Sequence, residues 1–166
     1  MSAHEHHRHG AHTHLKVAVI TASDSRTPET DESGGVIRSM LERAGHAVVH
    51  YEVVPDSPDQ IRQAVMDRLP AVDAIIINGG TGISARDNTI EAIRPLLSRE
   101  LEGFGELFRM LSYQEIGSAA FLSRAVAGVV HRRIVVALPG SPDACRLAMD
   151  KLLIPELGHM AHVLKQ

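Results

Sequence analysis

The sequence predicts an α/β fold, a three-layer sandwich built on a mostly parallel sheet with one antiparallel strand. Apolar, β-branched runs alternate along the chain with segments whose apolar residues recur at helical spacing. This alternation is typical of a parallel sheet covered by helices on both faces. Two late apolar runs flank the polar segment 131–133, which favours a hairpin and therefore the antiparallel strand.

The elements follow one another with no linker between domains. Strands are expected at residues 15–22, 47–54, 74–77, 125–130 and 134–138, and helices at 31–44, 57–69, 89–97, 104–115, 141–153 and 156–164. Gly45 is suited to end the first helix. Ser57, Pro58 and Gln60 form the pattern of a capping box at the start of the second.

Residues 1–14 are expected to be a disordered extension, separate from a single domain at 15–166. The extension holds six histidines and no apolar period, so it cannot bury enough surface to fold alone. Histidine-rich tracts also bind zinc, nickel or copper, and metal binding or a purification tag are open alternatives.

The charge, the cysteine content and the apolar segments of the sequence exclude several classes of protein. The net charge of −3 argues against a general nucleic-acid binder. The single cysteine, Cys145, excludes a disulfide framework, and its helical surroundings predict a buried side chain. No apolar stretch is long enough to span a membrane and no signal peptide precedes the first strand, so a cytoplasmic protein without a membrane partner is expected.

The most informative segment is the glycine-rich turn Asn78–Asp87, which joins a buried strand to the start of a helix. Glycine permits positive φ and a close approach to a ligand, and a helix N-terminus offers amides to an anion. Thr81 and Ser84 add hydroxyls, Arg86 a cation and Asp87 a carboxylate. The turn is therefore a candidate seat for a phosphorylated ligand. The alternative is a tight connection that binds nothing.

Two known phosphate loops match this turn only in part. It lacks the lysine of a P-loop. Gly80, Gly82 and Ala85 have the spacing of a dinucleotide fingerprint, but that fingerprint belongs on the first strand. The acidic residues at the expected distance, Glu100 and Glu102, lie in a segment without strand character. A dinucleotide-dependent enzyme is therefore an alternative that rests on the glycines alone.

The other strand ends are polar as well. Ser23 and Asp24 follow the first strand, Asp56 the second, and Gly140 and Ser141 the last. In open α/β sheets, ligands bind outside the carboxyl ends of the strands. We therefore expect a phosphate-bearing ligand at this edge, although each residue could also serve as a helix cap or turn former.

Asp56 and Asp87 are candidate magnesium ligands, provided that they follow neighbouring strands. Mg²⁺ favours one or two carboxylates together with substrate phosphates. No Ser-His-Asp signature is present. Phosphoryl or nucleotidyl transfer, in which the protein mainly positions groups and neutralises charge, is therefore favoured over hydrolysis by a nucleophile. Either carboxylate could instead be a solvated turn former.

Several ordered motifs resemble one protein family. They are Thr21–Arg26 with Asp31–Gly34, Gly79–Asp87, Gly103–Arg109, Leu122–Ala125 and Leu138–Pro142. Over about residues 15–164 the chain is similar to the molybdenum cofactor biosynthesis protein B and molybdopterin adenylyltransferase family, whose fold is shared by the G domain of gephyrin. The resemblance implies the molybdopterin-binding fold and a homotrimer or homohexamer.

For function, the resemblance implies adenylyl transfer from Mg-ATP to molybdopterin, with Asp56 and Asp87 in catalytic and magnesium-binding roles. The positions that would bind substrate are Ser23, Asp24, Gly79, Gly80, Thr81, Gly82, Ser84, Gly140 and Ser141. Some members of the B-type branch look like catalysts and others look like binders of pterin only. A non-catalytic pterin-binding or scaffold protein of the same pathway is therefore the alternative.

Overall fold

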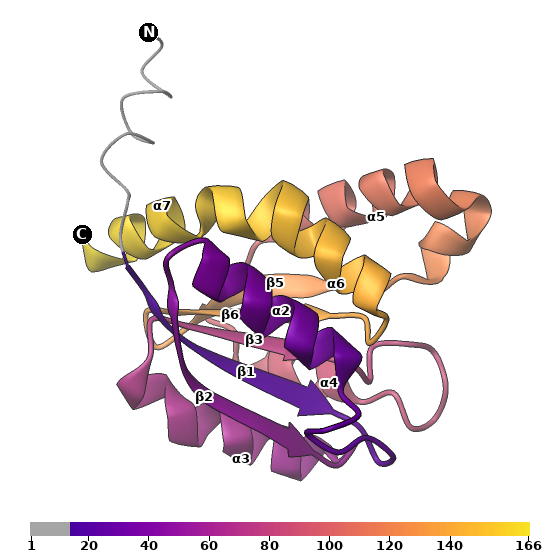
Figure 1. Ribbon diagram of the computed structural model, residues 1–166, viewed down its shortest axis with the longest axis horizontal. Helices are drawn as coiled ribbons and strands as arrows, with labels where there is room; N and C mark the ends of the chain where they lie inside the picture. Colours follow the sequence, from indigo (N-terminus) through magenta and orange to yellow (C-terminus); the bar gives the residue numbers. More distant parts are fainter. Residues whose placement is uncertain (1–13) are drawn as a thin grey trace, which may run out of the picture.

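The computed structural model describes residues 14–166, which form a six-stranded sheet between two layers of helices (Figure 1). The strands are β1 (Lys16–Ala22), β2 (Ala47–Val54), β3 (Ala74–Asn78), β4 (Arg99–Glu100), β5 (Val126–Val130) and β6 (Arg133–Leu138), in the spatial order β2-β1-β3-β6-β5-β4. Only β5 runs against the others, because it pairs antiparallel with both β6 and β4. The predicted fold class is confirmed.

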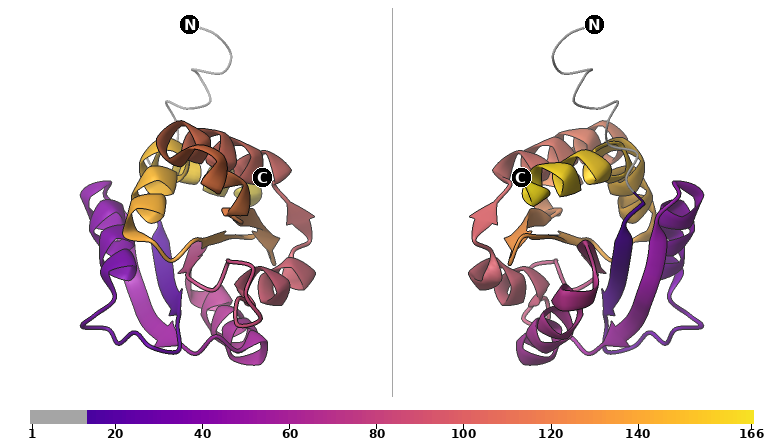
Figure 2. Two further views of the ribbon diagram at one scale, coloured as in Figure 1. Left: turned by 90° about the vertical axis from the view of Figure 1, so that its right-hand side faces the viewer. Right: turned by 90° about the vertical axis from the view of Figure 1, so that its left-hand side faces the viewer.

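Helices cover both faces of the sheet (Figures 1 and 2). One face carries α2 (Glu32–Arg43), α5 (Glu102–Ile116), α6 (Pro142–Ala148) and α7 (Ile154–Lys165), and the other carries α3 (Pro58–Arg68) and α4 (Thr89–Ile93). Val17 and Val19 of β1 lie in the core under the first layer, whereas Ala18 and Ile20 lie in the core under the second. Strands buried on both faces read as unbroken apolar runs, which is why they are visible in the sequence.

Short turns of helix complete the chain, namely η1 (Leu69–Ala71), η2 (Arg94–Leu96), η3 (Gly117–Leu122) and the π-helical turn η4 (Met149–Leu153). The histidine-rich tail predicted at 1–14 lies outside the described residues except for His14. Between residues 14 and 166, no helix has the length and apolar character needed to cross a membrane.

Most element boundaries agree with the predictions, and two helix starts show the local causes. Asp31 caps α2, because its Oδ1 accepts a hydrogen bond from the Gly34 amide at 3.0 Å. Ser57 stands at the N-cap of α3, but its side chain makes no capping hydrogen bond, so the predicted capping box was wrong. Pro58 favours the start of the helix instead, because its fixed φ suits the first helical position, where no backbone N–H is needed.

Two features differ from the predictions. Arg99 and Glu100 form the edge strand β4 opposite Val129 and Gly128, in a segment expected to lack strand character. This strand is made by ladder hydrogen bonds such as Leu101 N to Ala127 O at 2.7 Å, and a two-residue ladder leaves no apolar pattern. The helices expected at 141–153 and 156–164 run on without a break through the π-helical turn.

Candidate functional site

The carboxyl ends of four parallel strands meet at one edge of the sheet, at the right in Figure 1. Asp24 follows β1, Asp56 follows β2, and the glycine turn follows β3. The Asp56 amide donates to Asp24 Oδ1 at 3.0 Å, and the Gly79 amide donates to the Leu138 carbonyl of β6 at 3.1 Å. The predicted gathering of polar strand ends is present in the structure.

Glycine is required where these segments touch. Gly79 has φ +88°, and a Cβ there would overlap the carbonyl of Ala22 at the end of β1. Gly80 has φ +64°, and a Cβ there would lie 2.6 Å from Asp56 Oδ1. A Cβ on Gly140 would approach the Cα of Gly79 to 3.2 Å. Only glycine lets the turn lie this close to Asp56 and to the end of β6.

Asp87 is held by the turn that it closes. Its Oδ2 accepts hydrogen bonds from the Ser84 amide at 2.8 Å and from the Ser84 hydroxyl at 2.7 Å. These hydroxyl and amide donors lower the pKa of the Asp87 carboxyl, against a smaller opposing effect of burial, and the Gly82 amide adds to the lowering. Asp87 is therefore an ionised carboxylate fixed beside Gly82.

Asp56 has the opposite electrostatic character. Its Oδ1 is buried and has no hydrogen-bond partner in the part of the chain that the structure describes. Burial raises the pKa of this carboxyl, and the negative charges of Asp24 and Asp87 raise it further. A buried carboxylate oxygen without a partner calls for a missing group, and a hydrated divalent cation would supply it.

The donor set fits magnesium that arrives with a phosphorylated substrate. Within residues 14–166 no group of three or more His, Cys, Asp or Glu side chains could hold a metal by itself. Asp56 and Asp87 thus offer oxygen ligands of the right kind but too few for a closed protein site. Mg²⁺ commonly completes its coordination with water and substrate phosphates, so two carboxylates suffice.

The strands before these two carboxylates are not neighbours, contrary to the premise taken from the sequence. β1 lies between β2 and β3 in the sheet. The two carboxylates are nevertheless brought near one another, because the turn after β3 passes beside the residues that follow β2. Gly80 adjoins Asp56, and Asn88 Nδ2 donates to the Asp56 carbonyl at 3.5 Å.

A buried polar network, which was not predicted from the sequence, lies beneath the turn. Asn78 Nδ2 donates to Thr21 Oγ1 at 2.8 Å, and Thr21 Oγ1 donates to Asp31 Oδ2 at 2.6 Å. Ser33 and Tyr51 donate to Asp31 as well. Burial opposes ionisation of Asp31, but these hydrogen bonds together lower its pKa. The sequence signal that could have revealed this network is the presence of Thr21 and Asn78, two polar residues at the ends of otherwise apolar strands.

Several predicted ligand residues already serve local structure. Ser23 Oγ accepts from the Arg26 amide at 3.1 Å, and Ser141 Oγ caps α6 by accepting from the Ala144 amide at 3.2 Å. Thr81 is buried in the turn. Ser23 and Ser141 thus lie at the expected edge of the sheet. In this structure, however, the Ser23 hydroxyl stabilises a turn and the Ser141 hydroxyl caps a helix, which are the local roles considered as the alternative to ligand binding.

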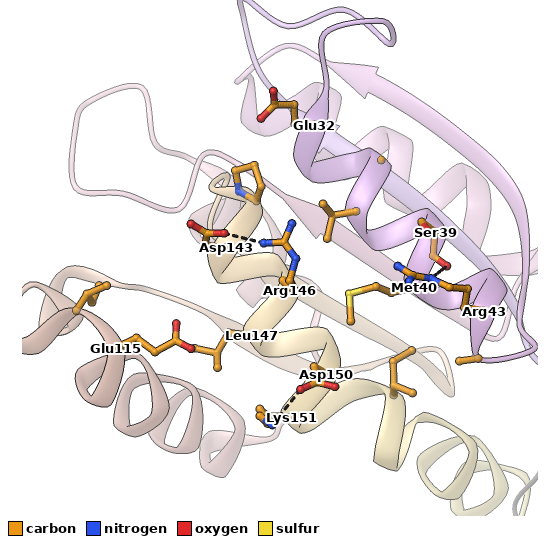
Figure 3. Close-up of a pocket in the computed structure, with 16 residues that line it drawn as sticks. Glu32, Ser39, Met40, Arg43, Glu115, Asp143, Arg146, Leu147, Asp150 and Lys151 are labelled. Atoms are coloured by element: carbon orange, nitrogen blue, oxygen red, sulfur yellow. Dashed lines mark hydrogen bonds and ion pairs between the residues drawn. The ribbon is translucent and has the colours of Figure 1, made fainter.

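A separate groove of about 1300 Å³ lies between α2 and the α6–η4 segment, near the end of α5 (Figure 3). None of the predicted site residues lines it. Two oppositely charged pairs neutralise part of its wall, Arg146 with Asp143 at 2.7 Å and Lys151 with Asp150 at 3.0 Å. The groove lies on the helical layer and begins beside Pro142 and Asp143, which follow Ser141, but neither Asp56 nor Asp87 lines it.

The two acidic residues of the dinucleotide alternative lie on the last edge strand and just after it, Glu100 on β4 and Glu102 at the start of α5. Glu100 lies on β4, separated from β3 by β6 and β5, and its carboxylate pairs with Arg94 at 3.0 and 3.1 Å. A ribose bound at the glycine turn would therefore not find this carboxylate within reach.

The glycine turn and the carboxylates lie outside the carboxyl ends of the strands, which is where open α/β proteins bind their ligands. Residues 18–159 match the family described as "Probable molybdopterin binding domain", and the chain belongs to that family. The resemblance inferred from the motifs is confirmed.

Among the relatives, the chain is 52% identical over 165 residues to "Molybdenum cofactor biosynthesis protein B" of Bacillus subtilis, covering 96% of each chain. A protein of the same name from Bacillus cereus is 50% identical over 157 residues, covering 93% of each.

Solved structures agree. A crystal structure of molybdenum cofactor biosynthesis protein B superposes with a TM-score of 0.91 at 50% identity, covering 93% of this chain and 98% of that one. The tungsten cofactor synthesizing protein MoaB from Pyrococcus furiosus gives a TM-score of 0.84 at 36% identity, covering 93% and 99%.

Proposed function

We propose that this protein acts in molybdenum cofactor biosynthesis, in the cytoplasm, by binding molybdopterin at the carboxyl edge of the sheet and adenylylating it with Mg-ATP. The observation that carries the proposal is the unpartnered, buried Asp56 Oδ1 beside Gly80, with the ionised Asp87 close by. The names of the relatives support the pathway.

In this proposal Asp56 and Asp87 hold the magnesium ion, which supplies neutralising charge to the phosphates when bound. The close approach at Gly79 and Gly80 lets backbone face the substrate phosphate without a side chain in between. Ser23, Asp24, Thr81, Gly82, Ser84, Gly140 and Ser141 complete the proposed substrate-binding set. The protein's work is to orient two phosphorylated molecules.

The reaction balances with these two substrates alone. A phosphate oxygen of molybdopterin forms a bond to the α-phosphorus of ATP, and the bond from that phosphorus to the bridging oxygen of the β-phosphate breaks. Pyrophosphate leaves with the electron pair, and adenylylated molybdopterin remains. Such a step requires the attacking oxygen to lie in line with the leaving oxygen, which is the task of the glycine turn.

The test is pyrophosphate release from Mg-ATP, with and without freshly prepared molybdopterin. We expect release that depends on molybdopterin, and a fall in kcat of about a hundredfold or more in Asp87→Asn, because a charged ligand is lost where charge develops. Asp143→Asn is the matched control, since that carboxylate is exposed and paired with Arg146 on α6. Asp87→Asn with unchanged release would contradict the catalytic role.

A non-catalytic pterin-binding protein is the second candidate, and one observation favours it. Asp87 Oδ2 already accepts two hydrogen bonds from Ser84, so this oxygen is satisfied without a metal. In this case molybdopterin would bind, as followed by its fluorescence, while no pyrophosphate is released at any Mg-ATP concentration. Turnover in the same sample rejects this candidate.

We also propose that the protein assembles as a homotrimer or homohexamer through the outer face of α5. Four large apolar side chains of this helix are exposed, and together they form an apolar row that winds around it because they follow at intervals of three residues: Leu107 (47% exposed), Met110 (53%), Tyr113 (64%) and Ile116 (55%), of which Ile116 also lines the groove beside α2. Phe121 of η3, the turn that follows α5, is 77% exposed as well. Exposed large apolar side chains that gather on one part of a protein are typical of surfaces for protein–protein contact.

A further inference from the structure

Arg124 reaches the glycine turn from a distant part of the chain. It lies in the connection between η3 and β5, and its guanidinium points at the backbone of the turn after β3. Nε donates to the Thr81 carbonyl at 2.9 Å and to the Gly82 carbonyl at 3.1 Å, and Nη2 donates to the Gly82 carbonyl at 2.6 Å. One side chain therefore holds two successive peptide carbonyls.

Glu91 of α4 fixes the outer edge of the same guanidinium. Arg124 Nη1 donates to Glu91 Oε1 at 2.5 Å, and Nη2 donates to Glu91 Oε2 at 3.3 Å. The Arg124 side chain is 31% exposed, so this pair is partly shielded from water. A planar fork held on both edges is fixed in direction as well as in place.

The direction of the carbonyls determines the direction of the neighbouring amides. In a planar trans peptide the N–H points opposite to the C=O. With the Thr81 carbonyl turned to Arg124, the Gly82 amide is turned to the other side. On that side lies Asp87, whose carboxyl pKa is lowered first by the Ser84 hydroxyl and also by the Gly82 amide. Arg124 thus acts on Asp87 through the backbone of the turn, and its positive charge also lowers the pKa of that carboxyl directly.

We propose that Arg124 is a positioning residue, which sets the amides of the glycine turn and the place of Asp87 by holding the carbonyls of Thr81 and Gly82. Its catalytic consequence rests on the proposed function, because it assumes that Asp87 and the turn receive magnesium and phosphate. Lysine cannot replace it, because a single ammonium on a flexible stem does not span two carbonyls and a carboxylate in one plane.

The direct test is hydrogen–deuterium exchange of the amides of residues 81–87 in Arg124→Gln and in Arg124→Lys. We expect exchange at least tenfold faster than in the wild-type protein. Arg94→Gln is the matched control, because Arg94 also makes a two-bond pair, at 3.0 and 3.1 Å, but its partner is Glu100 and not a carbonyl of the turn. Unchanged exchange in Arg124→Gln overturns the proposal, whether or not the protein is an enzyme.

The second readout separates positioning from a purely structural role. In pyrophosphate release, Arg124→Gln should lower kcat by roughly ten- to a hundredfold while the KM for ATP changes less than threefold, since displacement of reacting groups by about 1 Å has effects of this size. Guanidinium ion added to Arg124→Ala should restore part of kcat. Faster exchange with unchanged kcat would reject the positioning role.

If the wild-type protein releases no pyrophosphate, the proposed enzymatic function fails while the inference about Arg124 is still decided. The readout is then the affinity for molybdopterin, measured by its fluorescence. Arg124→Gln should weaken binding about tenfold and Arg94→Gln should leave it unchanged. Equal affinity in Arg124→Gln and wild type would overturn the inference.

Discussion

The carboxylate of Asp56 is compensated only in part by the rest of the protein, because the Asp24 amide and the charge of Arg86 lower its pKa less than burial, Asp24 and Asp87 raise it. Its Oδ1 is buried and unpartnered, and its pKa is raised by burial and by the charges of Asp24 and Asp87. Such an arrangement lowers the stability of the folded state, and residues of this kind concentrate where a ligand is to be received. Replacing the Asp56 carboxylate by a neutral side chain is therefore expected to stabilise the ligand-free protein.

Asp56→Asn should raise the free energy of unfolding of the ligand-free protein at pH 7 by about 0.5 kcal/mol, a value kept small because solvent screens a part-exposed group. The pKa of Asp56 is raised above its ordinary value of 3.8, so the folded protein binds this proton more tightly than the unfolded chain does. The wild-type protein thus regains stability as the pH falls through the raised pKa, and the advantage of the variant disappears below pH 3.8.

Urea unfolding of both proteins between pH 3.5 and 8 measures this difference. Asp59→Asn serves as a control, because that carboxylate is 90% exposed at the start of α3. A variant less stable than the wild type at pH 7 would show that Asp56 has a stabilising partner after all.

Some residues of the candidate site could be predicted from the sequence, and others could not. Carboxylates and glycines after strands could be assigned to one edge because the ends of parallel strands converge there. Arg124 was visible only as part of a motif, because its contacts with Thr81 and Gly82 span more than 40 positions. The partners of Asp31 were hidden for the same reason, since Thr21 and Tyr51 reach it from two different strands.

Among the elements, the β5–β6 turn is strained by its own sequence. His131 has φ 45° and Arg132 has φ 62°, so two non-glycine residues occupy the left-handed region that a two-residue hairpin of this type requires. Asparagine and glycine are the residues that adopt this conformation readily. The hairpin itself was predicted from the flanking apolar runs, but the strain depends on the length of the turn.

His131→Asn should therefore stabilise the protein, by about 0.5 kcal/mol, because asparagine tolerates positive φ better than histidine. The measurement is the midpoint of thermal unfolding. Arg132→Gly is an informative comparison: it relieves backbone strain but loses the two hydrogen bonds that Arg132 donates to the Leu164 carbonyl at 3.1 and 2.8 Å. A destabilised His131→Asn variant would show that a contact of the imidazole stabilises the protein by more than the backbone strain at this position destabilises it.

The elements that the sequence revealed are those with a repeating burial pattern. β1 and β3 are buried along nearly their whole length, so their apolar runs were unmistakable. β4 has two exposed residues and joins the sheet through backbone hydrogen bonds, without a buried apolar side chain of its own. The π-helical turn at Met149–Leu153 shifts the hydrogen bonding within a helix while leaving its apolar spacing nearly intact, so no pattern marked it.

At the scale of the whole molecule, the two helical layers differ in what they leave exposed. The layer of α3 and α4 shows Met66 at 37% exposure as an isolated apolar side chain of α3. The layer of α2, α5, α6 and α7 carries the apolar row on α5, at the top right of Figure 1.

Met110→Glu should dissociate the proposed assembly, because it places a charge at the centre of the apolar row, where Met110 is 53% exposed in the single chain. Light scattering coupled to size-exclusion chromatography should give a trimer or hexamer for the wild-type protein and a monomer for the variant, with unchanged circular dichroism. Met66→Glu on α3 makes the same chemical change outside the row and should leave the mass unaltered. A monomeric wild-type protein, or dissociation by Met66→Glu instead of Met110→Glu, would exclude α5 as the contact surface.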